Sequence, residues 1–286
     1  MIRLSEIKLP LSEAQDPGAP LQAAVAGILR LAPSDILQVD IFKRSFDARK
    51  ADLMAVYIVD VELISGHEAA LLAKFAGNPH IQPTPDMVWH PPAHAPVSLA
   101  QRPVVVGFGP CGIFAALALA QMGLQPIVLE RGKTVRERTR DTWDLWRKKV
   151  LNPESNVQFG EGGAGTFSDG KLYSQIKDPR HLGRKVMNEF VQAGAPAEIL
   201  YEAHPHIGTF KLVKVVENLR AQIIALGGEI RFGQRVTDVR IERGHVRALT
   251  VLDQASGQSH ELAANQVVLA LGHSARDTFT MLHARG

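Results

Sequence analysis

A glycine-rich turn between a short apolar run and an apolar helical stretch is the feature that most constrains this fold. The turn reads GFGPCG over 107–112, follows the β-branched run Val104-Val105-Val106, and precedes an Ala- and Leu-rich stretch that Gly123 ends. The next apolar run ends in Glu130, 23 residues after Gly107. A strand, a glycine turn, a helix and a second strand with a terminal acid predict a βαβ unit that binds a dinucleotide.

Each residue of this unit has a physical task in such binding. Gly107 permits the tight turn, Gly109 lets a diphosphate approach the backbone, and Gly112 lets the helix pack closely on the strand. The helix offers unpaired N–H groups and the positive end of its dipole to the phosphates. Glu130 is placed to accept hydrogen bonds from a ribose diol. The alternative is a glycine turn that holds no ligand.

Composition narrows the class of protein further. The 286 residues are 45% apolar and 21% charged, which suits one large or two ordinary domains and excludes wholesale disorder. The N-terminus has no apolar signal segment, and the longest apolar run, 113–120, is far shorter than the roughly 20 residues of a membrane span. The single cysteine, Cys111, excludes an internal disulfide and a multi-cysteine zinc site, and we expect its side chain to pack as a small apolar group under the start of the helix. We therefore expect a cytoplasmic protein with no membrane partner and no metal.

The first third of the chain predicts a small α+β module over residues 1–77. Apolar residues recur at helical spacing over 21–31 and 67–75, and they alternate with polar ones over 36–42 and 55–63. This β-α-β-β-α order is consistent with a ferredoxin-like module.

The rest of the chain predicts a linker over 78–103 and a second domain over 104–286. The linker holds 7 of the 17 prolines, which fix φ and remove donors. In the second domain, strand patterns over Glu229–Phe232 and Gln266–Leu271 flank a β-meander over 235–262. The fold class is therefore α/β, with a Rossmann-like FAD/NAD(P)-binding domain that has a central parallel sheet.

A second glycine-rich stretch favours FAD over NAD as the dinucleotide. It reads GEGGAGTFSDGK over 160–171, with five glycines in twelve residues. Such a loop brings backbone amides against a bulky ligand, and Thr166 and Ser168 supply hydroxyl donors. Val236, which opens the meander, would meet the adenine through its backbone.

Several motifs together make the chain resemble a known family. It resembles the bacterial FAD-dependent dehydrogenase-like proteins, a largely uncharacterised family within the NAD(P)/FAD-dependent oxidoreductases of the glutathione-reductase type. The motifs that carry the resemblance lie at 107–112 with 130–132, 152–159, 160–172, 204–209 and 271–277. The resemblance implies a bound FAD and redox chemistry on an unknown small-molecule substrate, with NAD(P)H as a candidate electron donor. Similar proteins continue into a substrate domain after the segment that matches Gly272, so the chain resembles a C-terminally truncated member.

The candidate site follows from these motifs and this resemblance. The flavin would carry the hydride or electron-pair transfer, while the protein supplies position and charge. Lys171 is the candidate for stabilising negative charge on the reduced flavin, and His206 is the candidate acid or base. Each has an ordinary alternative, as a surface lysine and a loop histidine. We predict these cofactor-binding residues: Gly107, Gly109, Pro110, Cys111, Gly112, Glu130, Arg131, Gly162, Gly163, Gly165, Thr166, Ser168, Gly170, Val236 and Gly272.

Two other functions compete with the flavoenzyme. One is a catalytically incomplete nucleotide-binding or partner-binding protein. The other is nucleic-acid binding through the basic stretch 131–149, which holds 8 basic and 3 acidic residues with Trp143 and Trp146 between them. The ordinary interpretation of this stretch is a solvated helix face with both tryptophans turned inward. The acidic balance of residues 1–100, with 8 basic and 11 acidic residues, also disfavours nucleic acid.

Overall fold

The computed structural model describes residues 1–49, 51–64, 66–174 and 176–285, which form two compact units. The first unit comprises Met1–Val88, Leu172–Arg184 and Ala197–Pro205. The second comprises Trp89–Lys171, Lys185–Pro196 and His206–Gly286. Sequence analysis places the boundaries at residues 77 and 103, whereas the first unit extends further and includes two later segments.

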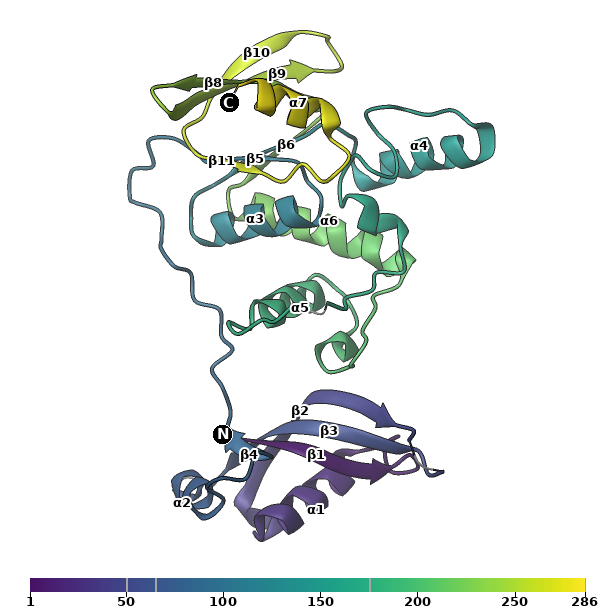
Figure 1. Ribbon diagram of the computed structural model, residues 1–286, viewed down its shortest axis with the longest axis vertical. Coiled ribbons are helices and arrows are strands. Elements are labelled where there is room, and N and C mark those ends of the chain that lie inside the picture. The colour runs from purple at the N-terminus through teal and green to yellow at the C-terminus, as the bar shows by residue number, and fades with distance from the viewer. Residues whose placement is uncertain (50, 65, 175, 286) are drawn as a thin grey trace. The chain divides into compact units, whose positions relative to one another are not determined.

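The first unit is built on an antiparallel sheet with the strand order β2-β3-β1-β4 (Figure 1). Both of its α-helices lie on one face of this sheet, and the element order βαββαβ is that of ferredoxin-like folds. The elements are β1 (Ile2–Pro10), α1 (Gly18–Leu29), the 3₁₀ turn η1 (Pro33–Asp35), β2 (Ile36–Asp47), β3 (Met54–Leu63), α2 (His67–Lys74) and β4 (Ile81–Pro83). Strand β4 lies within the stretch expected to be a linker.

Alternation of apolar residues gives this sheet its buried face. Helix α1 adds Leu21, Val25 and Leu29 to the same core, at a spacing of four residues. Every second residue of β3 is at most 4% exposed: Ala55, Tyr57, Val59, Val61 and Leu63.

Backbone pairing explains why a later segment belongs to the first unit. The N–H of Arg44 in β2 donates to the carbonyl of Tyr201, and the N–H of Ala203 donates to the carbonyl of Arg44 at 3.0 Å. The Arg44 guanidinium also pairs with Glu202. Such pairing leaves no local pattern in the sequence, so the predicted boundaries at 77 and 103 do not include it.

The second unit is built on a parallel sheet with the order β11-β5-β6-β7. Strands β5 and β6 are buried at every residue, because both faces of the sheet are covered. The elements before the meander are β5 (Val104–Val106), α3 (Pro110–Gln121), β6 (Ile127–Glu130), α4 (Val135–Lys148), the 3₁₀ turn η2 (Ala164–Phe167), α6 (Thr209–Ala225) and β7 (Glu229–Phe232). Between them in sequence the chain also forms α5 (Leu182–Gln192), most of which belongs to the second unit, and the 3₁₀ turn η3 (Ala197–Leu200), which belongs to the first.

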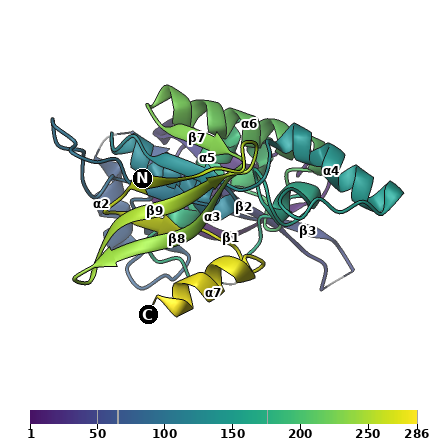
Figure 2. The same cartoon turned by 90° about the horizontal axis from the view of Figure 1, so that it is seen from above.

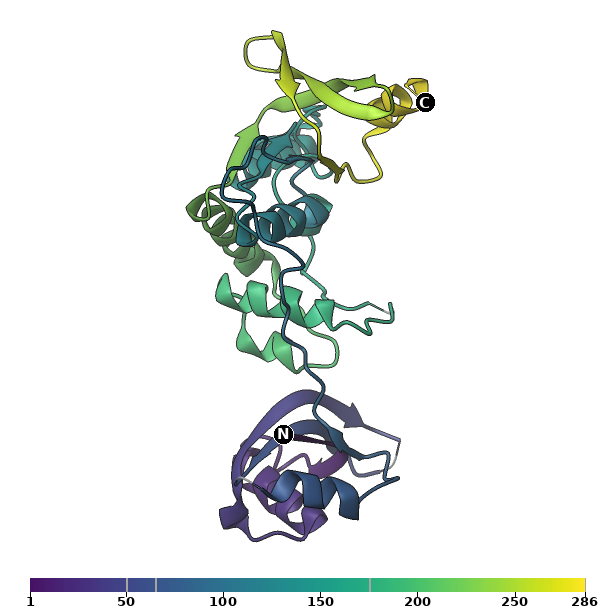
Figure 3. The same cartoon turned by 90° about the vertical axis from the view of Figure 1, so that its left-hand side faces the viewer.

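A three-stranded antiparallel meander covers one face of the parallel sheet, and α3 and α6 cover the other (Figures 1 and 3). The meander consists of β8 (Gln234–Glu242), β9 (His245–Asp253) and β10 (Ser259–Ala263), followed by β11 (Val267–Leu269) and α7 (Arg276–Ala284). Val236 and Val251 of the meander share one apolar core with Val104 and Leu129 of the sheet. Figure 2 shows α7 alongside β8. The guanidinium of Arg285, directly after α7, donates to Asp238 of β8 at 2.7 Å. The mixed α/β fold, the parallel sheet and the meander are as expected.

Candidate functional site

The glycine turn joins β5 to α3, and two of its three glycines are required by the protein itself. Gly107 has φ +99°, and a Cβ there would lie 2.4 Å from the carbonyl oxygen of Ala270. A Cβ on Gly112 would lie 1.9 Å from the carbonyl oxygen of Gly107, so this glycine lets the helix pack on the strand. Gly109 differs from both. Its φ of −76° suits any residue, and an added Cβ would come no closer than 3.7 Å to other atoms.

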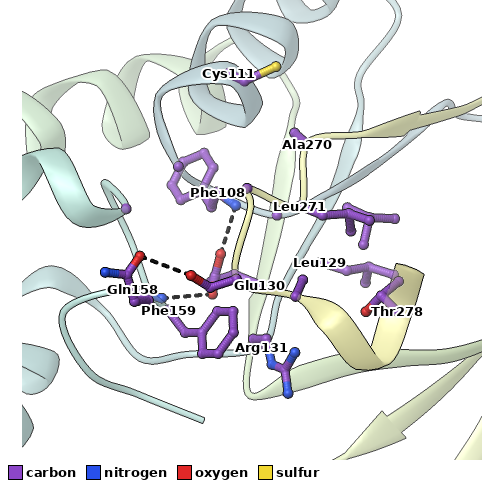
Figure 4. A pocket seen from close by; sticks show the side chains of 18 of the residues that line it. Phe108, Cys111, Leu129, Glu130, Arg131, Gln158, Phe159, Ala270, Leu271 and Thr278 are labelled. Carbon is purple, nitrogen blue, oxygen red and sulfur yellow. Dashed lines mark hydrogen bonds between the residues drawn. The ribbon is translucent and has the colours of Figure 1, made fainter. Parts of the chain in front are cut away.

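A cavity of about 280 Å³ opens in front of this turn (Figure 4). Its walls come from the carboxyl ends of the parallel strands, from the two glycine loops and from the start of β8, which is where open α/β sheets place their ligands. Helix α3 faces the cavity without a side-chain cap, and Pro110 at its first position has no N–H to satisfy. The principal segments lining the cavity are 106–111, 129–131, 158–160, 163–165, 234–236 and 270–275.

Glu130 lies at the end of β6, lines the cavity and is 4% exposed. Its Oε1 accepts hydrogen bonds from the N–H groups of Gly132 at 2.8 Å and Gly160 at 3.0 Å. Its Oε2 accepts one from the N–H of Phe108 at 2.7 Å (Figure 4). A carboxylate has about four acceptor positions, so three are occupied and one on Oε2 is left for a ligand hydroxyl.

Arg131 also lines the cavity, and neighbouring acids fix its position. Its guanidinium donates to Glu154 at 2.7 Å and to Asp277 at 3.0 Å, and it lies over the ring of Phe159 with the centroid 4.3 Å away. Arg235 donates to the other oxygen of Glu154 at 2.8 Å. Both arginines line the cavity, and the carboxylates of Glu154 and Asp277 balance their charge.

The second glycine loop is bonded to the first, but only part of it lines the cavity. The N–H of Gly162 donates to the carbonyl of Phe108 at 2.9 Å, and Gly163 and Gly165 are lining residues. Thr166 is buried, and its hydroxyl turns to the loop backbone. The Ser168 hydroxyl donates to the carbonyl of Gly165 at 2.7 Å.

Of the remaining predicted residues, some line the cavity and others do not. Cys111, Val236 and Gly272 line the cavity, together with Pro110. The Cys111 side chain is exposed, so the expected packing beneath the helix is wrong. The predicted residues that do not line the cavity are Gly112, Gly162, Thr166, Ser168 and Gly170.

Lys171 and His206 lie beside each other but not in the cavity. An isolated antiparallel bridge pairs the two residues, and both are exposed. The ammonium of Lys171 lies 3.5 Å from a carboxylate oxygen of Asp169, with 78% of the lysine side chain exposed. Neither residue is among those that line the cavity.

A buried arginine behind the cavity wall was not anticipated from the sequence. Arg138 of α4 is 0% exposed and donates to carbonyl groups of the segment 156–163. Burial lowers the pKa of its guanidinium to about 10, although the nearby acids Glu130 and Glu161 act to raise it. The only sign of this burial in the sequence is a basic residue at a helix position that faces the core. It could not be distinguished from the other basic residues of 131–149.

The basic stretch itself offers less free charge than its sequence indicates. Arg136 pairs with Glu217, Lys133 with Asp141 and Lys148 with Asp144, while Arg138 is buried. Trp143 and Trp146 are 45% and 55% exposed, so the expectation that both turn inward is wrong. The buried face of α4 is instead formed by Val135, Arg138 and Thr142.

The described residues contain neither a candidate membrane span nor a candidate metal site. No helix in the described ranges is long and apolar enough to cross a bilayer. No group of three or more His, Cys, Asp and Glu side chains in the same ranges is arranged to hold a metal ion.

Comparison with known proteins matches the N-terminal residues to one family, and it matches nearly the whole chain to part of a longer protein. Residues 1–62 match a family described as a domain of unknown function (DUF8436). An uncharacterised protein of Clostridium beijerinckii is 40% identical over 286 residues, which are 99% of this chain and 50% of that protein. The chain therefore spans half the length of this curated relative.

Solved structures with similar folds are flavoproteins and related enzymes. THI4 of Thermovibrio ammonificans has a TM-score of 0.44 at 18% identity, covering 65% of this chain and 62% of that one. A glycerol-3-phosphate dehydrogenase of Bacillus halodurans, solved with FAD, has a TM-score of 0.41 at 13% identity, covering 63% of this chain and 36% of that one. Both scores are below 0.5, and at these identities the similarity concerns the fold alone.

Proposed function

We propose that this chain binds FAD and serves a flavin-dependent oxidoreductase, with the ADP half of the cofactor in the cavity before α3. One observation carries the proposal: Gly109 has an ordinary backbone conformation, and a Cβ there would make only an ordinary van der Waals contact, so nothing in the described residues requires glycine there. A diphosphate that comes against the backbone does require it.

The surroundings of Gly109 support the same ligand. The uncapped first turn of α3 favours negative charge. Glu130 offers an acceptor to a ribose hydroxyl, and the guanidinium groups of Arg131 and Arg235 line the same cavity. A volume of about 280 Å³ is at the lower end of ligand pockets, roughly 300 to 1,000 Å³. We infer that the cavity takes one nucleotide half and that the flavin lies beyond it.

When bound, the flavin supplies the hydride or electron-pair chemistry. The chain's own residues bind and orient the cofactor: the turn at Gly109 and α3 take the phosphates, and Glu130 takes the ribose. Lys171 and His206 stay candidates for charge stabilisation and proton transfer at the flavin. NAD(P)H is the candidate electron donor, and the substrate is a small molecule.

Titration of the purified chain with FAD and with ADP tests the proposal. We expect both to bind, and the Gly109→Ala variant to bind ADP about a hundredfold more weakly, or ~2.7 kcal/mol. Thermal unfolding of this variant should match the wild type. Gly27→Ala in α1 is the control, because its Cβ would meet nothing within 4 Å. A wild-type chain that binds neither nucleotide would contradict the proposal.

A second candidate is a nucleotide-binding unit that is catalytically incomplete by itself. The exposure of Lys171 and His206 favours it, because groups that act on a bound flavin are usually enclosed from water. The two candidates differ in the flavin half of the ligand. FAD that binds no more tightly than ADP, with no flavin reduction by NAD(P)H, would favour the incomplete unit.

A further inference from the structure

Arg138 donates all of its hydrogen bonds to backbone carbonyls of one loop. Its Nε and Nη2 donate to the carbonyl of Asn156 at 3.1 and 2.8 Å, and Nη2 also donates to that of Val157 at 2.9 Å. Its Nη1 donates to the carbonyls of Gly160, Glu161 and Gly163 at 3.1, 2.5 and 2.9 Å.

Along the chain, these contacts lie on both sides of the Gly160 N–H. The carbonyls of Asn156 and Val157 come before the N–H of Gly160, and the carbonyl of Gly160 comes directly after it. Gly160 also lies against the arginine stem, since a Cβ there would be 2.6 Å from Cδ of Arg138. The arginine therefore holds the backbone on both sides of the Gly160 N–H.

The Gly160 N–H donates to Oε1 of Glu130 at 3.0 Å. Glu130 lines the cavity, whereas Arg138 does not. A path of direct contacts thus runs from the buried guanidinium through Gly160 to the carboxylate at the ribose end of the proposed site.

We propose that Arg138 is a positioning residue for ligand selectivity: it holds the Gly160 N–H on Glu130 and so keeps the remaining acceptor of that carboxylate directed at a ribose hydroxyl. This inference rests on the proposed binding of a dinucleotide. It assigns the preference for a ribose diol to a residue that never touches the ligand.

The chemistry of the guanidinium explains why this role needs arginine. Five N–H donors in a fixed plane match the five carbonyls that converge on Arg138. A buried charge is costly unless hydrogen bonds satisfy it. Lysine keeps the charge but has three donors, so Arg138→Lys leaves at least two of the five carbonyls without their donor and lets Gly160 turn.

Calorimetric titration with ADP and with 2′,3′-dideoxy-ADP tests this role. We expect the wild-type chain to bind ADP about tenfold more tightly, the value of one hydrogen bond to a charged group. In Arg138→Lys that ratio should fall close to one, with the affinity for the dideoxy nucleotide nearly unchanged. Glu130→Gln should lower the ratio as well, and combining it with Arg138→Lys should lower it no further.

Arg136→Lys is the matched control, because this neighbour on α4 is exposed and pairs with Glu217; its ratio should stay at the wild-type value. An Arg138→Lys variant that weakens both nucleotides equally would overturn the inference, since a purely structural role predicts that result. If Arg138→Lys does not fold, amide hydrogen exchange of the wild-type chain decides: the Gly160 N–H should be among the slowest of this loop to exchange, and rapid exchange there would contradict the inference. A wild-type chain that binds neither nucleotide overturns the proposed function together with this inference.

Discussion

Two helices of the second unit follow parallel strands in the same way, yet their N-termini are finished differently. Helix α3 begins after β5 with Gly109, which has no side chain to cap it. Helix α4 begins after β6 with two acids at its first turn. Glu137 accepts from the N–H of Thr134 at 3.3 Å, and buried Glu161 accepts from the N–H of Val135 at 2.7 Å.

This difference distinguishes an open helix end from one that the protein closes with its own side chains. Both helices direct a positive dipole end and unpaired N–H groups to the carboxyl edge of the sheet. At α4 the protein supplies the negative charge itself. At α3 it leaves the end open toward the cavity, so an anion from outside has a place there.

The largest effect is expected where glycine serves the fold of α3 rather than the ligand. Gly112→Ala places a Cβ 1.9 Å from the carbonyl oxygen of Gly107, and neither backbone segment can yield cheaply. We expect a loss of unfolding free energy above about 4 kcal/mol, measured by urea denaturation. Helix propensity alone would favour alanine over glycine by ~1 kcal/mol, so a stabilised variant would contradict the packing described here.

Closing α3 in the manner of α4 should abolish binding without harming the fold. Gly109→Asp places a carboxylate at the N-cap, in a backbone conformation typical of capping residues. We expect the free chain to gain about 0.5 kcal/mol from the cap and dipole. Its affinity for ADP should fall more than about a hundredfold, or ~2.7 kcal/mol, in a titration beside Gly27→Ala. Retention of ADP binding would place the phosphates elsewhere.

The converse change at α4 should affect stability alone. Thr134→Ala removes the hydroxyl that bonds to Glu137 at 2.6 Å. We expect a loss of about 1 kcal/mol in unfolding free energy, the usual cost of a lost cap, and no change in the affinity for ADP. A weakened affinity would mean that the α4 end also takes part in binding.

The sequence predicted the open end and missed the closed one. The turn at 107–112 and Glu130 follow from local spacing, because each glycine acts within the same βαβ unit. Arg138 could not be predicted to be buried, since its partners are carbonyls 18 to 25 residues later in the chain. The exposure of Trp143 and Trp146 escaped prediction for the same reason: the arginine, and not the tryptophans, occupies the face of α4 that turns inward.

The smallest predicted effect is a pH dependence of stability that differs between Glu161 and Glu217, two acids that contact α4. Burial raises the pKa of Glu161, whose Oε1 meets no partner within the described part of the chain, although the Val135 N–H and Arg220 act to lower it. The hydrogen bond from Arg136 lowers the pKa of Glu217, against a smaller effect of burial.

A raised pKa means that the folded chain holds a proton that the unfolded chain has released. The stability that Glu161 contributes is therefore complete below the unfolded value near 4.5 and is lost as pH rises through its folded pKa. Glu161→Gln cannot titrate, so the unfolding free energy of the wild type should fall relative to this variant between pH 4 and 7. Relative to Glu217→Gln, the unfolding free energy of the wild type should instead rise over the same range. The pKa of Glu217 is lowered in the folded chain, so its contribution is present above 4.5 and is lost as pH falls. Urea denaturation across this range measures both differences, and equal slopes for the two variants would contradict the effect of burial on Glu161.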